Sequence, residues 1–209
     1  MKFYDCREAP SPRRVRIFAA EKSIELNTVP VDLRAGEQFG AAFRAINPDC
    51  VVPVLELDDG TRITEVLAIC DYLEALHPEP PLFGPTPVDR ALTMMWNFKV
   101  EQQGLWPVAE AFRNATPGLE RNALPGPDQY EQIAELVPRS RRRAAAFLAR
   151  LDDQLHDREF ITGSRFTIAD ISALVVVDFA KRLKIAAEQL TPNLDRWHAA
   201  VSARPSAAA

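Results

Sequence analysis

Long apolar runs are missing from this sequence, and glycine and cysteine are scarce in it. The 209 residues include only 8 glycines and 3 cysteines, although 47% of them are hydrophobic. No apolar run approaches the roughly 20 residues that a membrane-spanning helix needs. The first ten residues, MKFYDCREAP, lack the apolar stretch of about 7–15 residues that marks a signal peptide. We therefore expect a cytoplasmic protein with no segment in a membrane.

These shortages also exclude several kinds of site. Cys6, Cys50 and Cys70 are spaced too widely for a CxxC redox pair or a zinc site of paired cysteines, and their odd number does not fit a disulfide framework. The sequence contains no HExxH metal motif, no P-loop and no GxGxxG fingerprint for dinucleotides. We expect reduced thiols, no metal and no nucleotide cofactor.

Basic residues do not outnumber acidic ones. The chain has 25 Lys and Arg against 29 Asp and Glu, which gives a net charge of −4. This balance argues against a nucleic-acid partner. Two local basic runs, RRVR at 13–16 and RSRRR at 139–143, are expected to lie on solvated helix faces.

The first part of the chain, residues 1 to about 76, alternates strand-like and helical stretches. Their order is β-α-β-α-β-β-α, the pattern of an α/β domain whose last two strands form a hairpin at Asp59-Gly60. In the final helix the apolar residues recur at i, i+3, i+4 and i+7, which predicts one stripe that covers the sheet. This stripe is made of Val66, Ile69, Cys70 and Leu73.

A proline-rich segment separates this part from the rest of the chain. Residues 77–87, HPEPPLFGPTP, hold five prolines in eleven positions, which suits neither a helix nor a central strand. We place the domain linker there. Beyond it, residues 88–209 are predicted to form an all-α domain, in which Pro107 and Pro138 kink or split the first two helices. The helices are expected at about 88–113, 128–156, 167–182 and 192–203.

The third of these helices has a clear start and an apolar body. Thr167 can cap it, and Asp170, three residues on, can reach back to the free N–H of Thr167. The stretch IADISALVVVDFA that follows is apolar on nearly every side, which predicts the central buried helix of its domain.

Several motifs occur together in an order that resembles the cytosolic glutathione transferase superfamily. They are the β-α-β-α-β-β-α unit, the segment NPDCVVPVLELDDGTRITEVLAICDYLE at 47–74, the proline-rich linker, and FTIADI at 166–171 in the helical part. The resemblance implies a thioredoxin-like glutathione-binding domain at 1–76, followed by a C-terminal helical bundle. It also implies glutathione as co-substrate and a homodimer.

The resemblance assigns the glutathione site to two short stretches. A cis peptide bond before Pro53 would turn the N–H and C=O of Val52 outward, where they pair with the cysteinyl part of glutathione as a strand would. At the next helix start, the N–H of Val66 would receive the γ-glutamyl carboxylate and the Glu65 side chain would suit the ammonium group. Two departures from the family pattern weaken the expected affinity. Val51 replaces a Lys or Gln of many relatives, and Val66 replaces the usual Ser.

Activation of the glutathione thiol requires a hydrogen-bond donor near the start of the first helix. A thiol of pKa about 8.5 is mostly protonated at neutral pH. Relatives that place Ser or Cys five residues before the Arg of "RV" align it with Ala9, which cannot donate. Relatives that use Asn three residues before that Arg align it with Ser11, our predicted catalytic residue. Two alternatives stay open: Ser11 only shapes the helix start, or Cys6 acts in disulfide exchange.

The predicted electrophile pocket involves the segment MMWNFKVEQQGLW at 94–106. Trp96 and Trp106 would supply apolar walls, although aromatic residues at helical spacing also serve as core or dimer contacts. The expected function is transfer of the glutathione sulfur to a small hydrophobic electrophile, as in detoxification. Isomerase, dehalogenase or disulfide-reductase chemistry would use the same glutathione site. The alternative is a non-catalytic relative that binds hydrophobic ligands or protein partners, which Ala9, Val51 and Val66 favour.

Overall fold

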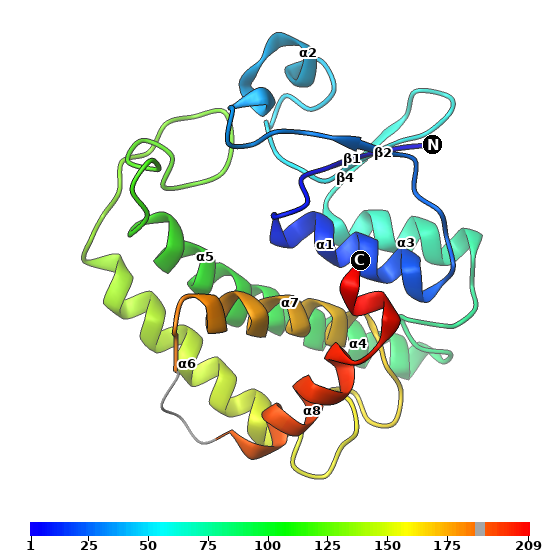
Figure 1. Ribbon diagram of the computed structural model, residues 1–209. Helices are drawn as coiled ribbons and strands as arrows, with labels where there is room; N and C mark the ends of the chain where they lie inside the picture. Colours follow the sequence, from blue (N-terminus) through cyan, green and yellow to red (C-terminus); the bar gives the residue numbers. More distant parts are fainter. Residues whose placement is uncertain (187–190) are drawn as a thin grey trace. The chain divides into compact units, whose positions relative to one another are not determined.

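The chain divides into two compact units. The computed structural model describes residues 1–186 and 191–209 (Figure 1). The first unit comprises Met1–Pro80 with Pro125–Gln129 and Ala209, and the second comprises Pro81–Leu124 with Tyr130–Ala208. The change of unit after Pro80 falls inside the segment predicted as the linker. An α/β unit followed by an all-α unit confirms the predicted fold class.

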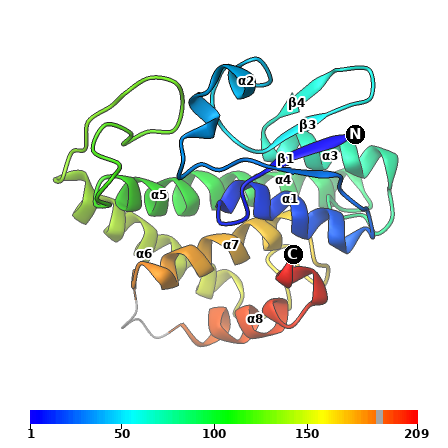
Figure 2. The same ribbon diagram turned by 45° about the horizontal axis from the view of Figure 1, so that its top comes forward.

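The first unit is built around a four-stranded mixed sheet of order β2-β1-β3-β4. Strands β1 and β2 run parallel, whereas β1 with β3 and β3 with β4 run antiparallel. In this register Tyr4 of β1 lies opposite Val29 on one side and Val54 on the other. Helices α1 and α3 pack against each other on one side of the sheet, and α2 lies on the other (Figure 2). The elements are β1 Lys2–Asp5, α1 Pro10–Glu21, β2 Thr28–Pro30, η1 Glu37–Phe39, α2 Ala41–Arg44, β3 Val54–Glu56, β4 Arg62–Thr64 and α3 Val66–Leu76.

The helices of this unit bury the faces that their sequences specify. The predicted apolar stripe of α3 is confirmed, because all four of its residues are buried. Helix α1 begins with prolines in its first turn, where no backbone donor is needed. At its other end the Lys22 side chain is fully buried, with its Nζ 2.6 Å from a Glu74 carboxylate oxygen of α3. The same ammonium donates to the carbonyls of His77 and Pro80, so this buried charge is fully paired.

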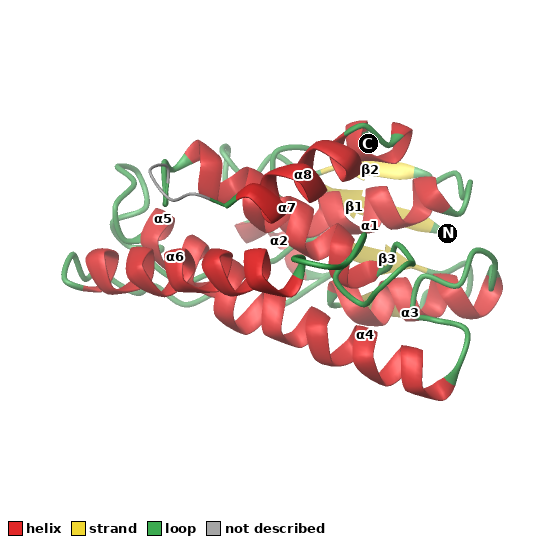
Figure 3. Cartoon of the chain, turned by 90° about the horizontal axis from the view of Figure 1, so that it is seen from below, coloured by secondary structure: helices red, strands yellow, loops and turns green. Residues whose placement is uncertain are grey.

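The second unit is helical. Helices α4, α5 and the six-residue π-helical stretch between them run without interruption, and Figure 3 shows them as one long rod. The π-helical stretch ends just before Pro107, so the chain accommodates this proline without the predicted split. No helix in the described ranges is both long and apolar enough to cross a membrane. The elements are α4 Pro87–Lys99, η2 Val100–Leu105, α5 Trp106–Arg113, α6 Leu136–Gln154, α7 Ile168–Arg182, α8 Pro192–Ser202 and η3 Pro205–Ala208.

The predicted helix from 128 is wrong at its start. Helix α6 begins at Leu136, and Pro138 lies in its first turn, where it needs no hydrogen-bond donor and splits nothing. Residues 115–135 instead form a loop, because Pro125, Gly126 and Pro127 oppose a helix. The loop is closed by a bond from the N–H of Ala123 to the carbonyl of Tyr130, 2.9 Å long.

Helix α7 is the central helix of this unit, as predicted. Twelve of its 15 residues are buried, and it packs against α4, η2 and α8. The close approach of its neighbours depends on Gly104 in η2. A Cβ atom added there would lie 2.7 Å from the Phe147 ring and 3.0 Å from Val176, so that only glycine fits between α6 and α7.

A buried carboxylate fixes the start of α7. Asp170 is fully buried and accepts hydrogen bonds from the N–H groups of Ile161 and Thr167, the Thr167 hydroxyl and the indole N–H of Trp197, all 2.9–3.0 Å long. The predicted reach of Asp170 back to the Thr167 N–H is therefore confirmed. Burial raises the pKa of Asp170 to about 6, while the four donors act in the opposite direction.

Asp170→Asn should lower the free energy of unfolding by about 2–4 kcal/mol. The amide N–H2 of asparagine would face groups that now donate hydrogen bonds to the carboxylate, and two donors cannot pair. The substitution should also change how the free energy of unfolding depends on pH. The folded pKa of about 6 exceeds the ordinary 3.8, so the folded protein keeps a proton that the unfolded chain releases. The stabilisation that protonated Asp170 gives the folded state is therefore complete below about pH 4 and is lost as the pH rises through 6. Urea unfolding across this range should show a flatter profile for Asp170→Asn. The exposed Asp153→Asn is the control, and equal slopes in both variants would contradict the assignment.

Candidate functional site

The backbone of Val52, beside the sheet, has unpaired hydrogen-bonding groups. The Val52–Pro53 peptide bond is cis, as expected. Within the described residues, neither the N–H nor the C=O of Val52 takes part in a hydrogen bond. Its side chain is buried in a cluster with Tyr4, Phe43 and Val54, so the residue is anchored while its backbone stays open. An extended peptide can pair with such an edge.

Asn47 holds the turn that leads to Val52. Its side chain is almost fully buried; the amide N–H2 donates to the carbonyl of Val51 at 2.9 Å, and its oxygen accepts from the N–H of Asp49 at 3.1 Å. Cys50 follows in the left-handed region at φ 55°. Asn47 was not predicted as part of the site, although a buried-turn role for Asn before Pro is a signal that the sequence carries.

Glu65 stands directly before α3 in a strained conformation. Its φ of 66° is rare for a residue with a side chain and costs about 1–3 kcal/mol. The first hydrogen bond of the helix runs from Ile69 to the Glu65 carbonyl. The N–H groups of Val66, Leu67 and Ala68 therefore have no acceptor within the described residues, and the helix dipole makes this end attractive to an anion. The Glu65 side chain is exposed and adds a negative charge beside it.

Ser11 lies in the first turn of α1. The residue that precedes the helix is Ala9, so Ser11 is not its N-terminal cap. The Ser11 hydroxyl oxygen accepts a hydrogen bond from the Arg14 guanidinium at 3.4 Å, and Arg14 is buried. Ala9 and Cys6 pack against the same cluster as Val52, which places the start of α1 next to the open backbone edge. Ser11 follows Ala9 by two residues, and its role in the site stays a prediction.

The cysteines give no sign of redox chemistry. All three are free, and Cys50 and Cys70 are buried. Cys6 is half-buried and lies 3.6 Å from a Glu8 carboxylate oxygen. Burial and this carboxylate raise the pKa of the Cys6 thiol, which keeps it protonated and a poor nucleophile. These properties argue against disulfide exchange by Cys6.

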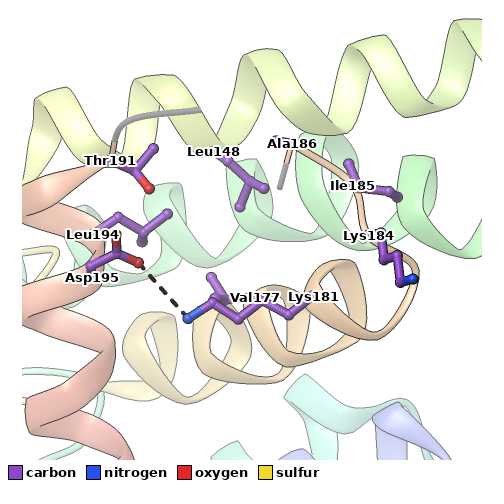
Figure 4. A pocket seen from close by; sticks show the side chains of 9 residues that line it. All are labelled: Leu148, Val177, Lys181, Lys184, Ile185, Ala186, Thr191, Leu194 and Asp195. Carbon is purple, nitrogen blue, oxygen red and sulfur yellow. Dashed lines mark ion pairs between the residues drawn. The ribbon is translucent and has the colours of Figure 1, made fainter. Parts of the chain in front are cut away.

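The two predicted pocket tryptophans belong to the second unit and have different surroundings. Trp96 is half-buried under the Lys99 ammonium, which lies 4.5 Å from the ring centre. Trp106 is 50% exposed. A cavity of about 270 Å³ between α6, α7 and α8 contains neither of them; Figure 4 shows its lining, which includes Lys181 and Asp195 with 3.9 Å between their charged atoms. The role of the tryptophans stays a prediction.

The described ranges hold no group of three or more His, Cys, Asp or Glu side chains arranged to bind a metal ion. The chemistry available at the site is that of backbone donors and acceptors at Val52, free N–H groups at the start of α3, and a hydroxyl at Ser11. Together these groups suit an extended peptide with one anionic end.

Comparisons with known proteins point the same way. The family profile described as "Glutathione S-transferase, N-terminal domain" matches residues 10–76, and "Glutathione S-transferase, C-terminal domain" matches residues 91–205. "Glutathione S-transferase 2" of Saccharomyces cerevisiae is 36% identical over 99% of this chain and 87% of its own length. A crystal structure of a glutathione S-transferase domain-containing protein from Marinobacter aquaeolei has a TM-score of 0.87 and 40% identity, over 99% of each chain. A maleylacetoacetate isomerase of Pseudomonas aeruginosa is 38% identical, over 44% of each chain.

Glu65→Gly should separate folding from binding. Glycine adopts positive φ without strain, so the variant should gain up to about 1 kcal/mol in the free energy of unfolding. The same change removes the carboxylate, and the dissociation constant for glutathione measured by calorimetry should rise at least about tenfold. Ser23→Gly is the matched control, because Ser23 also has a positive φ, 55°, and lies outside the site. Equal glutathione affinity in both variants would count against Glu65.

Proposed function

Because this chain belongs to the glutathione S-transferase family, we propose that it binds glutathione and transfers its sulfur to an electrophile. The observation that carries this proposal is the open backbone of Val52 next to the unpaired start of α3. This pairing of an exposed edge with a free helix end suits a small peptide that has a carboxylate at one end. The relatives named as glutathione S-transferases over the whole chain support it.

Glutathione is proposed to lie in extended form along Val52. Its cysteinyl N–H and C=O pair with the C=O and N–H of Val52. Its γ-glutamyl carboxylate accepts from the Val66 N–H at the start of α3, and its ammonium group meets the Glu65 carboxylate. Val51 offers no charge to the glycyl end, and Val66 offers no hydroxyl to the γ-glutamyl end. Each missing hydrogen bond to a charged group lowers affinity by about 1.5–3 kcal/mol unless another group replaces it.

Ser11 is proposed to stabilise the glutathione thiolate. Its oxygen already accepts from Arg14, so its own hydrogen is free to point at the sulfur. The positive charge of Arg14 polarises the hydroxyl and strengthens its donation to an anion. Lowering the thiol pKa from about 8.5 by two units corresponds to about 2.7 kcal/mol and makes the thiolate the main form at neutral pH. The thiolate then attacks an electrophilic carbon, and the leaving group departs with the bonding electron pair.

Ser11→Ala should raise the pKa of bound glutathione by about 1–2 units. The value of kcat/KM should therefore fall about 10- to 100-fold near pH 6.5 and approach that of the unchanged protein near pH 9, where the thiol ionises unaided. The ultraviolet absorbance of the thiolate as a function of pH measures the pKa directly. Ser11→Thr keeps a hydroxyl and should retain most of the activity. An unaltered pH profile in Ser11→Ala would remove Ser11 from catalysis.

The finer reaction is proposed as conjugation of a small hydrophobic electrophile, with a detoxification role in the cytoplasm and with Trp96 and Trp106 as candidate walls of its pocket. Isomerisation is a second candidate, which the partial match to a maleylacetoacetate isomerase favours. Ala9, Val51 and Val66 still favour a non-catalytic binder. Retention on immobilised glutathione together with conjugation of a reactive aryl halide supports the transferase, whereas retention without turnover of either substrate type supports the binder.

A homodimer is proposed from one face of α4. Four apolar side chains recur there at helical spacing and are 41–67% exposed: Val88, Leu92, Met95 and Phe98. An exposed apolar stripe of this kind marks an interaction surface, and a second copy of the chain is the partner that the family suggests.

Leu92→Glu should convert the dimer to a monomer, because a buried unpaired carboxylate costs far more than the apolar contact contributes. Sedimentation equilibrium measures the change in mass. Ala146→Glu places the same charge on an exposed position of α6 and should leave the mass unaltered. A dimer that survives Leu92→Glu would rule out this face.

A further inference from the structure

Asp178, Lys181 and His198 form a hydrogen-bonded chain in the second unit. Asp178 and Lys181 are three residues apart in α7, so they share a face of that helix, and His198 lies on the neighbouring helix α8. An Asp178 carboxylate oxygen lies 2.7 Å from Nε2 of the His198 ring, and the Lys181 ammonium lies 3.2 Å from Nδ1 of the same ring. The two side chains of α7 thus contact opposite nitrogens of one imidazole.

These partners determine which ring nitrogen of His198 carries the proton. A lysine ammonium only donates hydrogen bonds, so Nδ1 accepts from Lys181. The ring proton is then on Nε2, which donates to the Asp178 carboxylate. In this form the imidazole is neutral and its lone pair points at the lysine nitrogen. The carboxylate on the other side stabilises the imidazolium that forms when Nδ1 takes a proton.

The imidazole is shielded, whereas the amine can be reached from solvent. The His198 and Asp178 side chains are 18% and 26% exposed, while that of Lys181 is 52% exposed. Ser202 is not placed as a nucleophile, because its hydroxyl lies 3.4 Å from Nε2, the nitrogen that already faces Asp178. Asp195 lies 3.9 Å from the Lys181 ammonium (Figure 4). The order carboxylate, imidazole, nucleophile is therefore completed by the amine of Lys181.

We propose that Lys181 is an acyl-acceptor site, at which His198 acts as general base and Asp178 positions that base. The acyl donor is a thioester, because a thiol of pKa about 8.5 leaves as thiolate without help from an acid. This inference does not rest on the proposed function, since it uses residues of the second unit alone.

The reaction at Lys181 consumes two protons of its ammonium group. One proton passes to water, and the neutral amine attacks the carbonyl carbon of the thioester. As the carbon–nitrogen bond forms, the second proton passes to Nδ1 of His198. The carbon–sulfur bond then breaks, the thiolate leaves with the bonding electron pair, and an amide remains on Lys181. The imidazolium returns its proton to solvent or to the departing thiolate.

Chemical labelling of the intact chain measures the reactivity of each lysine. The probe is the small thioester S-acetyl-N-acetylcysteamine near neutral pH, and peptide mass spectrometry gives the acetylation rate at each position. Lys181 should react at least about tenfold faster than Lys2 and Lys184. Lys2 is the matched internal reference, because its side chain is 54% exposed and its ammonium lies 3.0 Å from the Glu56 carboxylate instead of an imidazole. Lys184 is an exposed reference close to Lys181 in the chain.

Variants of the base and of its positioning residue test the mechanism. His198→Gln removes the base, so the rate at Lys181 should fall to about that of Lys184 while the rate at Lys2 is unaltered. Asp178→Asn should lower the rate at Lys181 by a smaller factor, and Asp178→Glu, which keeps the carboxylate, should retain most of it. Equal rates at Lys181 and Lys184 in the native protein, or no change at Lys181 in His198→Gln, would overturn the proposal.

Two further readings distinguish chemistry from unfolding. Asp195→Asn removes a carboxylate that attracts the Lys181 ammonium, so it should speed the labelling of Lys181, whereas unfolding would equalise the rates. Lys22, whose side chain is fully buried, should stay unlabelled in every folded variant. A slower reaction of Lys181 in Asp195→Asn, with Lys22 still protected, would contradict the role given to the amine.

Discussion

A binding edge made of backbone must be rigid and yet keep its hydrogen-bonding groups unpaired. The first unit meets this constraint at Val52 by anchoring the residue through its side chain and through its neighbours. The Asn47 amide donates a hydrogen bond to the carbonyl of Val51, and the Val52 side chain packs in the apolar cluster around Phe43. The backbone N–H and C=O of Val52 are thus held in place but stay unpaired within the described residues. Loss of either support would let the edge collapse onto the sheet or fray into water, and the remaining site groups would have nothing to align with.

Glutathione as proposed here presents a γ-glutamyl carboxylate and a thiolate to the first unit, and the chain would stabilise each of them differently. The γ-glutamyl carboxylate meets backbone N–H groups and a helix dipole, which need no charged side chain. The thiolate meets a hydroxyl that Arg14 polarises. A hydroxyl donor favours the thiolate over the thiol, because ionised sulfur is much the stronger hydrogen-bond acceptor.

The sequence predicted the regular elements and several particular contacts. The apolar stripe of α3, the apolar surface of α7 on nearly every side, and the pairing of Thr167 with Asp170 follow from local sequence alone. The start of α6 was misplaced, because the helical pattern of residues 128–135 outweighed the nearby prolines in that prediction. The π-helical stretch and the brace at Asn47 depend on tertiary packing, which no local pattern encodes.

The π-helical stretch between α4 and α5 has a consequence for the register of everything that follows it. Each residue added to or removed from a helix rotates the remainder by about 100°. Loss of a single residue among Val100–Leu105 would therefore swing Trp106 away from the solvent side and turn Pro107 or Val108 outward. The extra residue that distinguishes a π turn from an α turn thus decides which side chains this long rod offers to small molecules.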